Sequence, residues 1–132
     1  MHRLDPHRLR QLAASASVGF AQAAPFAHAV LDQFLPAGHA AALASDFPKP
    51  DDPIWADWRQ RTGHQYGKQG TRNSDQFWRL PDTLYASLLE FNSHVFLEFL
   101  QQLTGLDALL PDPYFQGGGL HQIVSGGILD IH

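Results

Sequence analysis

Cysteine is absent from this chain of 132 residues. Without thiols the chain forms no disulfide and offers neither a thiolate metal ligand nor a cysteine nucleophile. Any metal must therefore be held by histidine and carboxylate side chains. The absence also suits a reducing compartment, so we expect a cytoplasmic location.

Basic charge and long apolar runs are scarce as well. Nine Lys and Arg residues stand against thirteen Asp and Glu residues, a formal charge of −4, which argues against nucleic acid or an anionic lipid surface as a partner. No run approaches the roughly 18 apolar residues of a membrane span. The Ala-rich stretch 12–26 follows three arginines, but Ser15, Ser17 and Gln22 interrupt it, so it does not make a convincing signal peptide. We therefore expect neither nucleic acid nor membrane as a partner.

The residues that are present predict one folded domain. A hydrophobic share of 44% with 17% charged residues lies in the globular range and far from the composition of disordered chains. A length of 132 residues is enough for one core and short for two. We expect a single domain, residues 1–132.

The first part of the chain predicts helices with short strands between them. Asp5 followed by Pro6 predicts a helix start, and apolar residues at spacings of three and four continue the helix to about Gly19. The β-branched and aromatic stretch 26–34 predicts a strand, and Pro36 opens an Ala-rich helix. The following stretch, 48–79, begins with prolines that exclude regular structure and then predicts loops and short strands.

Residues 84–103 carry the clearest helical pattern. Their apolar side chains recur at three and four residues, with Asn92 as a cap between two helices and Gly105 as the C-terminal stop. We expect this segment to be helical and to bury four apolar residues against a sheet. They are Leu88, Phe96, Phe99 and Leu100.

Two groups of glycines lie near the end of the chain. The run 117–119 precedes apolar residues 120–124, and Ser125, Gly126 and Gly127 separate these from residues 128–132. A phosphate-binding loop precedes a helix, whereas here a strand follows, so the first run predicts positive φ angles or close backbone approach. Two short apolar runs around a Gly-Gly turn predict an antiparallel hairpin over residues 120–132.

Most histidine and aromatic side chains have an ordinary structural interpretation. The aromatic residues are expected to pack in the core or in loops. Four histidines lie in different predicted elements without pairing on one helix face, and we expect them to be exposed or hydrogen-bonded. They are His28, His39, His64 and His94. In the last strand, alternation places Leu129 and Ile131 on one face and Asp130 and His132 on the other, so specific chemistry is best placed there.

The segment NSHVFLEFLQQLTGLDALLPDPYFQGGGLHQIVSGGILDIH, residues 92–132, resembles the part of prolyl-4-hydroxylase-like dioxygenases that precedes their metal site. In that family a helix is followed by a glycine-rich strand, a Gly-Gly turn and a strand that ends His-x-Asp, and His132 stands at the His position. The stretch AVLDQFLPAGHAAALASDFP, residues 29–48, is similar to the strand and helix with which these enzymes begin. The resemblance is weakest over residues 51–79.

The resemblance implies an α+β fold in which N-terminal helices pack on the start of a double-stranded β-helix, a jelly-roll barrel that is incomplete here. It implies iron(II), 2-oxoglutarate and ascorbate as the cofactors of the complete enzyme. There, iron and 2-oxoglutarate hydroxylate an unactivated C–H bond, while the protein positions the substrate. Prolyl residues of a peptide or protein are the expected substrate, and a small molecule is the other option.

The resemblance also names the candidate site residues. His132 is the implied metal ligand, while the Asp two positions on, the distal His and the basic residue that anchors 2-oxoglutarate are not in this sequence. One ligand of a His-carboxylate-His triad cannot impose its geometry on iron, so we expect the chain as given to be inactive.

In related enzymes a polar side chain of the preceding strand faces the cosubstrate. In the predicted hairpin a three-residue loop sets Gln122 opposite Asp130, whereas a two-residue loop sets His121 opposite His132. We favour Gln122 as the 2-oxoglutarate contact and keep His121 as the alternative. For both, a polar residue that lines a barrel without contacting a ligand is an equal alternative.

Two functions of other classes stay open. One is a non-catalytic jelly-roll-like module that binds a sugar or a peptide through its aromatic residues. The other is a structural role in which an open sheet edge pairs with a partner or with a second copy of the chain. An Asp encoded at the second position after His132 would favour the enzyme.

Overall fold

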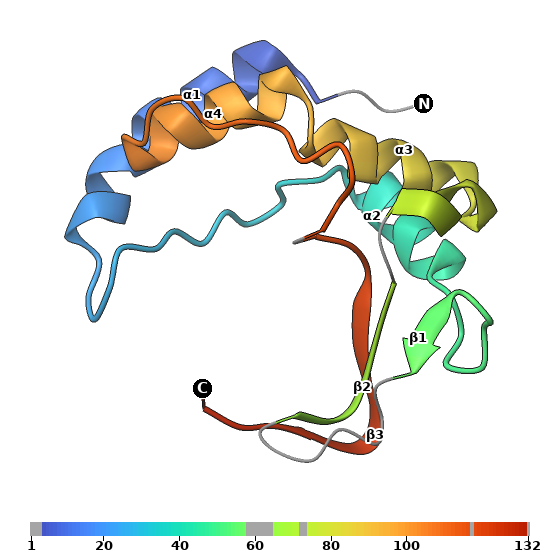
Figure 1. Ribbon diagram of the computed structural model, residues 1–132. Coiled ribbons are helices and arrows are strands. Elements are labelled where there is room, and N and C mark those ends of the chain that lie inside the picture. The colour runs from blue at the N-terminus through green and yellow to red at the C-terminus, as the bar shows by residue number, and fades with distance from the viewer. Residues whose placement is uncertain (1–3, 58–64, 72–73, 117, 132) are drawn as a thin grey trace. The chain divides into compact units, whose positions relative to one another are not determined.

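The computed structural model describes residues 4–57, 65–71, 74–116 and 118–131. Helices and a small three-stranded antiparallel sheet are both present, which confirms the α+β class. The chain forms two compact units, and Figure 1 shows the elements of each. We call Met1–Ser45 with Ala86–Pro111 the helical unit, and Asp46–Tyr85 with Asp112–His132 the sheet unit. The single domain expected from the chain length stays a prediction.

Helix α1 (Pro6–Gln22) begins where the sequence predicted. The Asp5 carboxylate accepts a hydrogen bond from the backbone N–H of His7 at 2.9 Å. Pro6 occupies the first turn, where a backbone N–H would have no helical partner. The helix continues past Gly19, because one glycine lowers the stability of a helix without ending it.

Helices α3 (Asp82–Phe91) and α4 (His94–Thr104) occupy the segment with the clearest apolar stripe, as predicted. The break between them falls at residues 92–93. Ser93 rather than Asn92 caps α4, and its hydroxyl accepts a hydrogen bond from the backbone N–H of Phe96 at 3.4 Å. Gly105 ends α4 with a φ of 75°, which confirms the predicted stop.

Helix α4 packs against α1 within the helical unit, and the packing against a sheet that the sequence suggested stays a prediction. The two helices lie side by side in Figure 1. Their shared core contains buried residues from each helix, namely Leu9, Ala13, Phe99 and Leu103. Of the four residues expected to be buried, Phe99 is 3% exposed and the others are half-buried. An apolar stripe shows that a helix face is covered, but a helix and a sheet cover it equally well.

Residues 26–34, all described, form no strand, so the strand predicted there was wrong. The Arg8 guanidinium of α1 donates to the carbonyl oxygens of Phe34 at 2.7 Å and Gln33 at 2.8 Å. It also lies 5.9 Å from the centroid of the Phe34 ring. A side chain thus takes the carbonyl groups that a neighbouring strand would need. The segment leads to α2 (Ala37–Asp46), the Ala-rich helix that the sequence predicted.

The sheet unit contains β1 (Trp55–Asp57), β2 (Gln65–Thr71) and β3 (His121–Leu129), in the order β1-β2-β3. Strands β1 and β2 confirm the short strands expected within residues 48–79. All pairing is antiparallel, and β3 is an edge strand among the strands that the structure describes. Phe77 of the short 3₁₀ helix η1 (Ser74–Arg79) is fully buried in this unit, with its ring centroid 5.1 Å from that of Phe115.

Strand β3 continues through the glycines at which a hairpin turn was predicted, so the hairpin over residues 120–132 was wrong. Its partner is β2, and the register shifts between the pairs Tyr66–Ile128 and Lys68–Ile123. At this bulge a Cβ on Gly127 would lie 2.8 Å from the carbonyl oxygen of Tyr66, so only glycine lets the strands approach. A Gly-Gly pair permits a bulge as readily as a turn, and the partner strand decides between them.

Among the described residues, no helix is long and apolar enough to cross a membrane. The cytoplasmic location expected from the sequence stays a prediction.

Candidate functional site on strands β2 and β3

Strand β3 carries both cosubstrate candidates, and β2 supplies their neighbours. Gln122 lies opposite Gln69, and His121 lies opposite Gly70. The predicted pairing of Gln122 with Asp130 was wrong, because it depended on the hairpin, and the alternative pairing of His121 with His132 falls partly outside the described residues. Successive residues of a strand point to opposite faces, so the two candidates cannot serve one site on the same face of the sheet. His132 lies outside the described residues.

The Gln122 side chain belongs to a chain of amide hydrogen bonds. Its Nε2 atom donates to Oε1 of Gln69 at 2.7 Å. The Nε2 atom of Gln69 donates in turn to the carbonyl oxygen of Pro50 at 2.9 Å. Gln69 is 2% exposed, whereas Gln122 is half-buried. The inner amide is thus enclosed by protein, and the outer one reaches solvent.

Loop and strand residues around Gln69 are held by further polar contacts. The indole N–H of Trp55, 8% exposed, donates to the carbonyl oxygen of Lys49 at 2.6 Å. This bond ties β1 to the loop that contains Pro50. At the start of β3, the backbone N–H of Leu120 donates to the Thr71 hydroxyl at 3.1 Å, and the Thr71 N–H donates to the Leu120 carbonyl oxygen at 3.0 Å. These bonds connect the loop with Pro50 to β1 and the end of β2 to the start of β3.

The glycine run before β3 has the structural role that the sequence predicted. Gly119 has a φ of 142°, and an added Cβ there would collide with the Thr71 hydroxyl. The run precedes a strand and not a helix, so the rejection of a phosphate-binding loop agrees with the fold. Gly117 lies outside the described residues.

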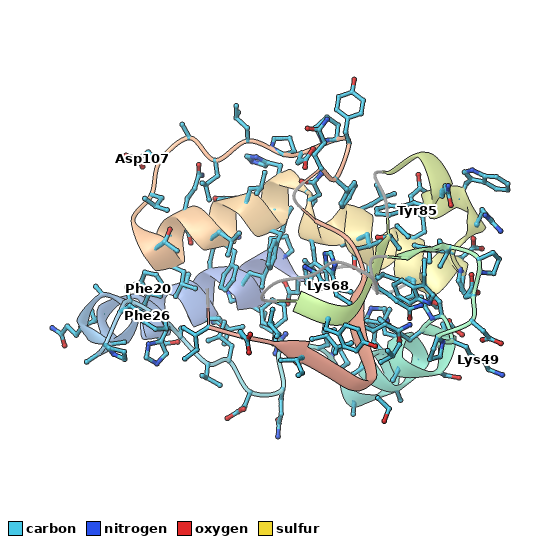
Figure 2. All side chains as sticks on the ribbon, turned by 60° about the horizontal axis from the view of Figure 1, so that its bottom comes forward. Phe20, Phe26, Lys49, Lys68, Tyr85 and Asp107 are labelled. Atoms are coloured by element: carbon cyan, nitrogen blue, oxygen red, sulfur yellow. The ribbon has the colours of Figure 1, made fainter. Side chains whose placement is uncertain are left out.

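His121 occupies the other face of β3, against the backbone of Gly70. Its ring lies where a Cβ of Gly70 would be, since that atom would come within 2.8 Å of Nδ1. Burial of part of the ring lowers the pKa of His121 below its usual value of 6.5, and the positive charge of Lys68 lowers it further. Figure 2 shows Lys68 on β2. A neutral imidazole beside a lysine can accept or donate a hydrogen bond, depending on its tautomer.

The described residues do not form a metal centre by themselves. Among residues 4–57, 65–71, 74–116 and 118–131, no three His, Asp or Glu side chains lie close enough to hold an ion. The other histidines behave as expected: His28 and His94 are exposed, and Nε2 of His39 is hydrogen-bonded to the Ser87 hydroxyl at 3.0 Å. His64 lies outside the described residues. The structure therefore adds no ligand to the one that the sequence suggests.

Sequence reasoning missed Gln69 and Lys68. Both lie in the polar stretch that predicted only loops and short strands, and no periodic pattern singles them out. Two of the seven residues of β2 are glycines, and glycine has a low propensity for strands, so the sequence indicates this strand only weakly. Only the pairing of β2 with β3 brings these side chains to the candidates.

Scans against protein-family models, curated proteins and solved structures gave no match for this chain.

Proposed function

We propose that this chain is the N-terminal part of an iron(II)- and 2-oxoglutarate-dependent dioxygenase of the prolyl-4-hydroxylase-like group. The observation that carries the proposal is the C-terminal segment, where a helix, a glycine run and the strand with Gln122 precede His132 in the sequence. The family's Gly-Gly turn is not seen among the described residues, because β3 continues through Gly126 and Gly127. Prolyl residues of a peptide or protein are the proposed substrate, with a small molecule as the other option. The sheet unit would then be the start of a jelly-roll barrel.

Iron, 2-oxoglutarate and ascorbate are proposed for the complete enzyme only. In such enzymes the iron and the 2-oxo acid supply the oxidising chemistry, and the protein supplies geometry. The described residues do not fit an iron site, because they include no group of three metal-binding side chains. The resemblance instead places His132 and two later ligands at the metal. We therefore derive no catalytic step from the described residues.

Gln122 remains the proposed contact with 2-oxoglutarate. A primary amide carries two N–H groups, and one of them donates to Gln69. The second N–H suits a carboxylate, which accepts hydrogen bonds but does not donate them. His121 is the alternative contact, and the alternation of the strand means that it would require a cosubstrate on the other face of β3.

Succinate formation tests the proposal. The chain 1–132 and the gene product extended beyond His132 are each assayed with iron(II), ascorbate and 2-oxoglutarate, and the extended His132→Ala variant is the matched control. We expect background rates from 1–132, because one imidazole does not impose a triad geometry. The extended chain should form succinate, and His132→Ala should abolish it.

Two results would contradict this proposal in different ways. An extended chain without succinate formation, and without an Asp two positions after His132, would refute the family assignment. Iron-dependent succinate formation by residues 1–132, abolished by His132→Ala, would instead refute the expectation that this chain is inactive by itself.

A second function is favoured by three exposed aromatic residues of the sheet unit. Tyr66, Trp78 and Tyr114 are 57%, 75% and 65% exposed, although the sequence predicted that aromatic residues pack in the core or in loops. Exposed rings of this kind suit a module that binds a sugar or peptide without redox chemistry. Tryptophan fluorescence during titration with oligosaccharides and proline-containing peptides tests this function, and Trp78→Ala should remove the signal. Binding that needs neither iron nor 2-oxoglutarate would favour the module over the enzyme.

A further inference from the structure

Three groups of the sheet unit form a directed series of hydrogen bonds, which we call the amide relay. It consists of the Pro50 carbonyl, the Gln69 side-chain amide and the Gln122 side-chain amide. Gln69 donates to Pro50 over 2.9 Å, and Gln122 donates to Gln69 over 2.7 Å. Among the described residues, no buried side-chain nitrogen or oxygen lacks a hydrogen-bond partner, so the relay is satisfied at its buried end.

The orientation of both amides follows from the chemistry of Pro50. A backbone carbonyl oxygen accepts hydrogen bonds and cannot donate them. If the Gln69 amide were turned over, its Oε1 would face the Pro50 oxygen with no hydrogen between two acceptors, in a place that is 2% exposed. The Nε2 atom of Gln69 must therefore face Pro50, and its Oε1 must face β3.

The same reasoning then applies to Gln122. Only a donor suits the Oε1 atom of Gln69, so Gln122 must present Nε2 to it. Gln122 is left with one N–H and its Oε1 atom for a ligand. Each amide of the relay donates through nitrogen, and such chains polarise each other, so the Gln122 oxygen becomes a stronger acceptor. A half-buried glutamine without this support would sample both orientations of its amide.

We propose that Gln69 is a positioning residue that sets the amide orientation of Gln122, with the Pro50 carbonyl as its anchor. The relay itself depends only on the sheet unit. Its consequence for 2-oxoglutarate rests on the proposed function, in which Gln122 contacts the cosubstrate. Gln69 would then raise the affinity for 2-oxoglutarate without touching it.

Side-chain amide signals in nitrogen-15 NMR spectra of residues 1–132 test the relay directly. Gln69→Met keeps the length of the side chain but removes its donor and acceptor. We expect the Gln122 N–H proton that bonds to Gln69 to exchange with water roughly two- to twelvefold faster in this variant, the factor that one neutral hydrogen bond supplies. The signals should also move toward those of an exposed glutamine.

The matched control reverses the roles of the two glutamines. In Gln122→Met, the Gln69 N–H protons should keep their protection, because Pro50 still accepts from this buried amide. This asymmetry is the signature of a relay anchored at Pro50. Unchanged Gln122 signals in Gln69→Met, or equal loss of protection in both variants, would overturn the proposal.

A second substitution covers the case in which Gln69→Met does not fold. In Gln69→Glu, burial favours the protonated carboxyl, which donates to Pro50 and accepts from Gln122 as the amide does. Near pH 5, about the upper range for an exposed glutamate, Gln122 should show the protection of the parent chain. Loss of that protection in a folded Gln69→Glu variant at this pH would also overturn the proposal.

The extended chain tests the consequence for the cosubstrate. In Gln69→Met the KM for 2-oxoglutarate should rise roughly two- to twelvefold while kcat stays unchanged, since the reacting atoms are untouched. If the KM for 2-oxoglutarate is unchanged while the Gln122 side-chain protons lose protection, the relay is supported and Gln122 does not contact the cosubstrate. An extended parent chain without any turnover would refute the proposed function, and the NMR comparison would still decide the relay.

Discussion

Replacing the two adjacent glycines of β3 one at a time distinguishes the bulge from the predicted hairpin turn. Gly126 has a φ of 80°, and an added Cβ there would meet no atom within 4 Å. Gly127 is the reverse case. A Cβ there would lie 2.8 Å from the carbonyl oxygen of Tyr66 and 2.9 Å from that of Val124. Alanine therefore introduces backbone strain at one position and a collision at the other.

The two costs differ in size. Alanine in a left-handed conformation costs about 1–2 kcal/mol, so Gly126→Ala should lower the free energy of unfolding by that amount. At Gly127 an added Cβ would collide with the Ile123 side chain and with two backbone carbonyl oxygens, and these oxygens cannot rotate away. Overpacking costs about 1–3 kcal/mol and a broken ladder hydrogen bond adds about 1 kcal/mol, so Gly127→Ala should cost about 2–4 kcal/mol.

Urea unfolding followed by tryptophan fluorescence measures these costs, because the buried Trp55 reports on the sheet unit. Hydrogen exchange of the amides near Tyr66 and Ile128, which pair beyond the bulge, then locates the damage. Gly127→Ala should expose these amides, and Gly126→Ala should leave them protected. Gly126→Asn is the control for strain, because asparagine tolerates the left-handed region and should cost less than alanine.

The hairpin makes a different prediction. In a two-residue hairpin turn both glycines are turn residues, and in the type favoured by Gly-Gly both have positive φ, so alanine would cost about the same at either position. Equal losses for Gly126→Ala and Gly127→Ala, with amides near Tyr66 unaffected by both, would refute the bulge.

Three further predictions concern other parts of the chain. Phe99 is 3% exposed, so Phe99→Ala should lower the free energy of unfolding by about 3–5 kcal/mol. Phe26 is 68% exposed, so the control Phe26→Ala should lower it by less than about 1 kcal/mol. Equal effects of the two substitutions in far-ultraviolet circular dichroism melts would contradict the helical core. The pKa of His121 is lowered in the folded chain, so the unfolded chain binds its proton first as the pH falls, and the free energy of unfolding should decrease below about pH 6.5. NMR titration should show that the pKa of His121 rises in Lys68→Met. An unchanged pKa in this variant would exclude the charge of Lys68 as a cause. Strand β3 lies at the edge of the sheet among the described strands and exposes apolar side chains, Ile128 by 55%, so we propose that the chain self-associates through this edge. Sedimentation should show concentration-dependent dimers that Ile128→Lys weakens, and a monomer at all concentrations would refute the proposal.

Local chemistry was enough to predict most helices of this protein. The start of α1 at Asp5 and Pro6 and the stop of α4 at Gly105 depend on capping and on φ preferences, which act within one turn of the chain. The apolar stripe of residues 84–103 likewise reports which helix face is covered, and Phe99 is buried as that stripe predicted. Such signals need no knowledge of distant residues.

The candidate site was predictable only in part. Gln122 and His121 were selected by a resemblance, and their presence on one strand is confirmed. Their partners were not predictable, because Gln69 and Gly70 are more than fifty residues away in sequence and belong to a strand with a weak signal. His132 lies outside the described residues, so its proposed role as a metal ligand stays a prediction.

What the sequence determined by itself is therefore the presence of the four α-helices, the start of α1, the end of α4 and the extended, glycine-containing character of residues 120–129. What only the tertiary structure decided is which surface each element covers. Residues 26–34 have the composition of a strand, yet Arg8 binds two of their carbonyl groups and no ladder forms. Gly126 and Gly127 suit a turn and a bulge equally well, and β2 selects the bulge by pairing on both sides of it. The physical reason is the same in both cases: backbone preferences act locally, whereas the hydrogen-bond partner of an extended segment is chosen by whatever chain folds beside it.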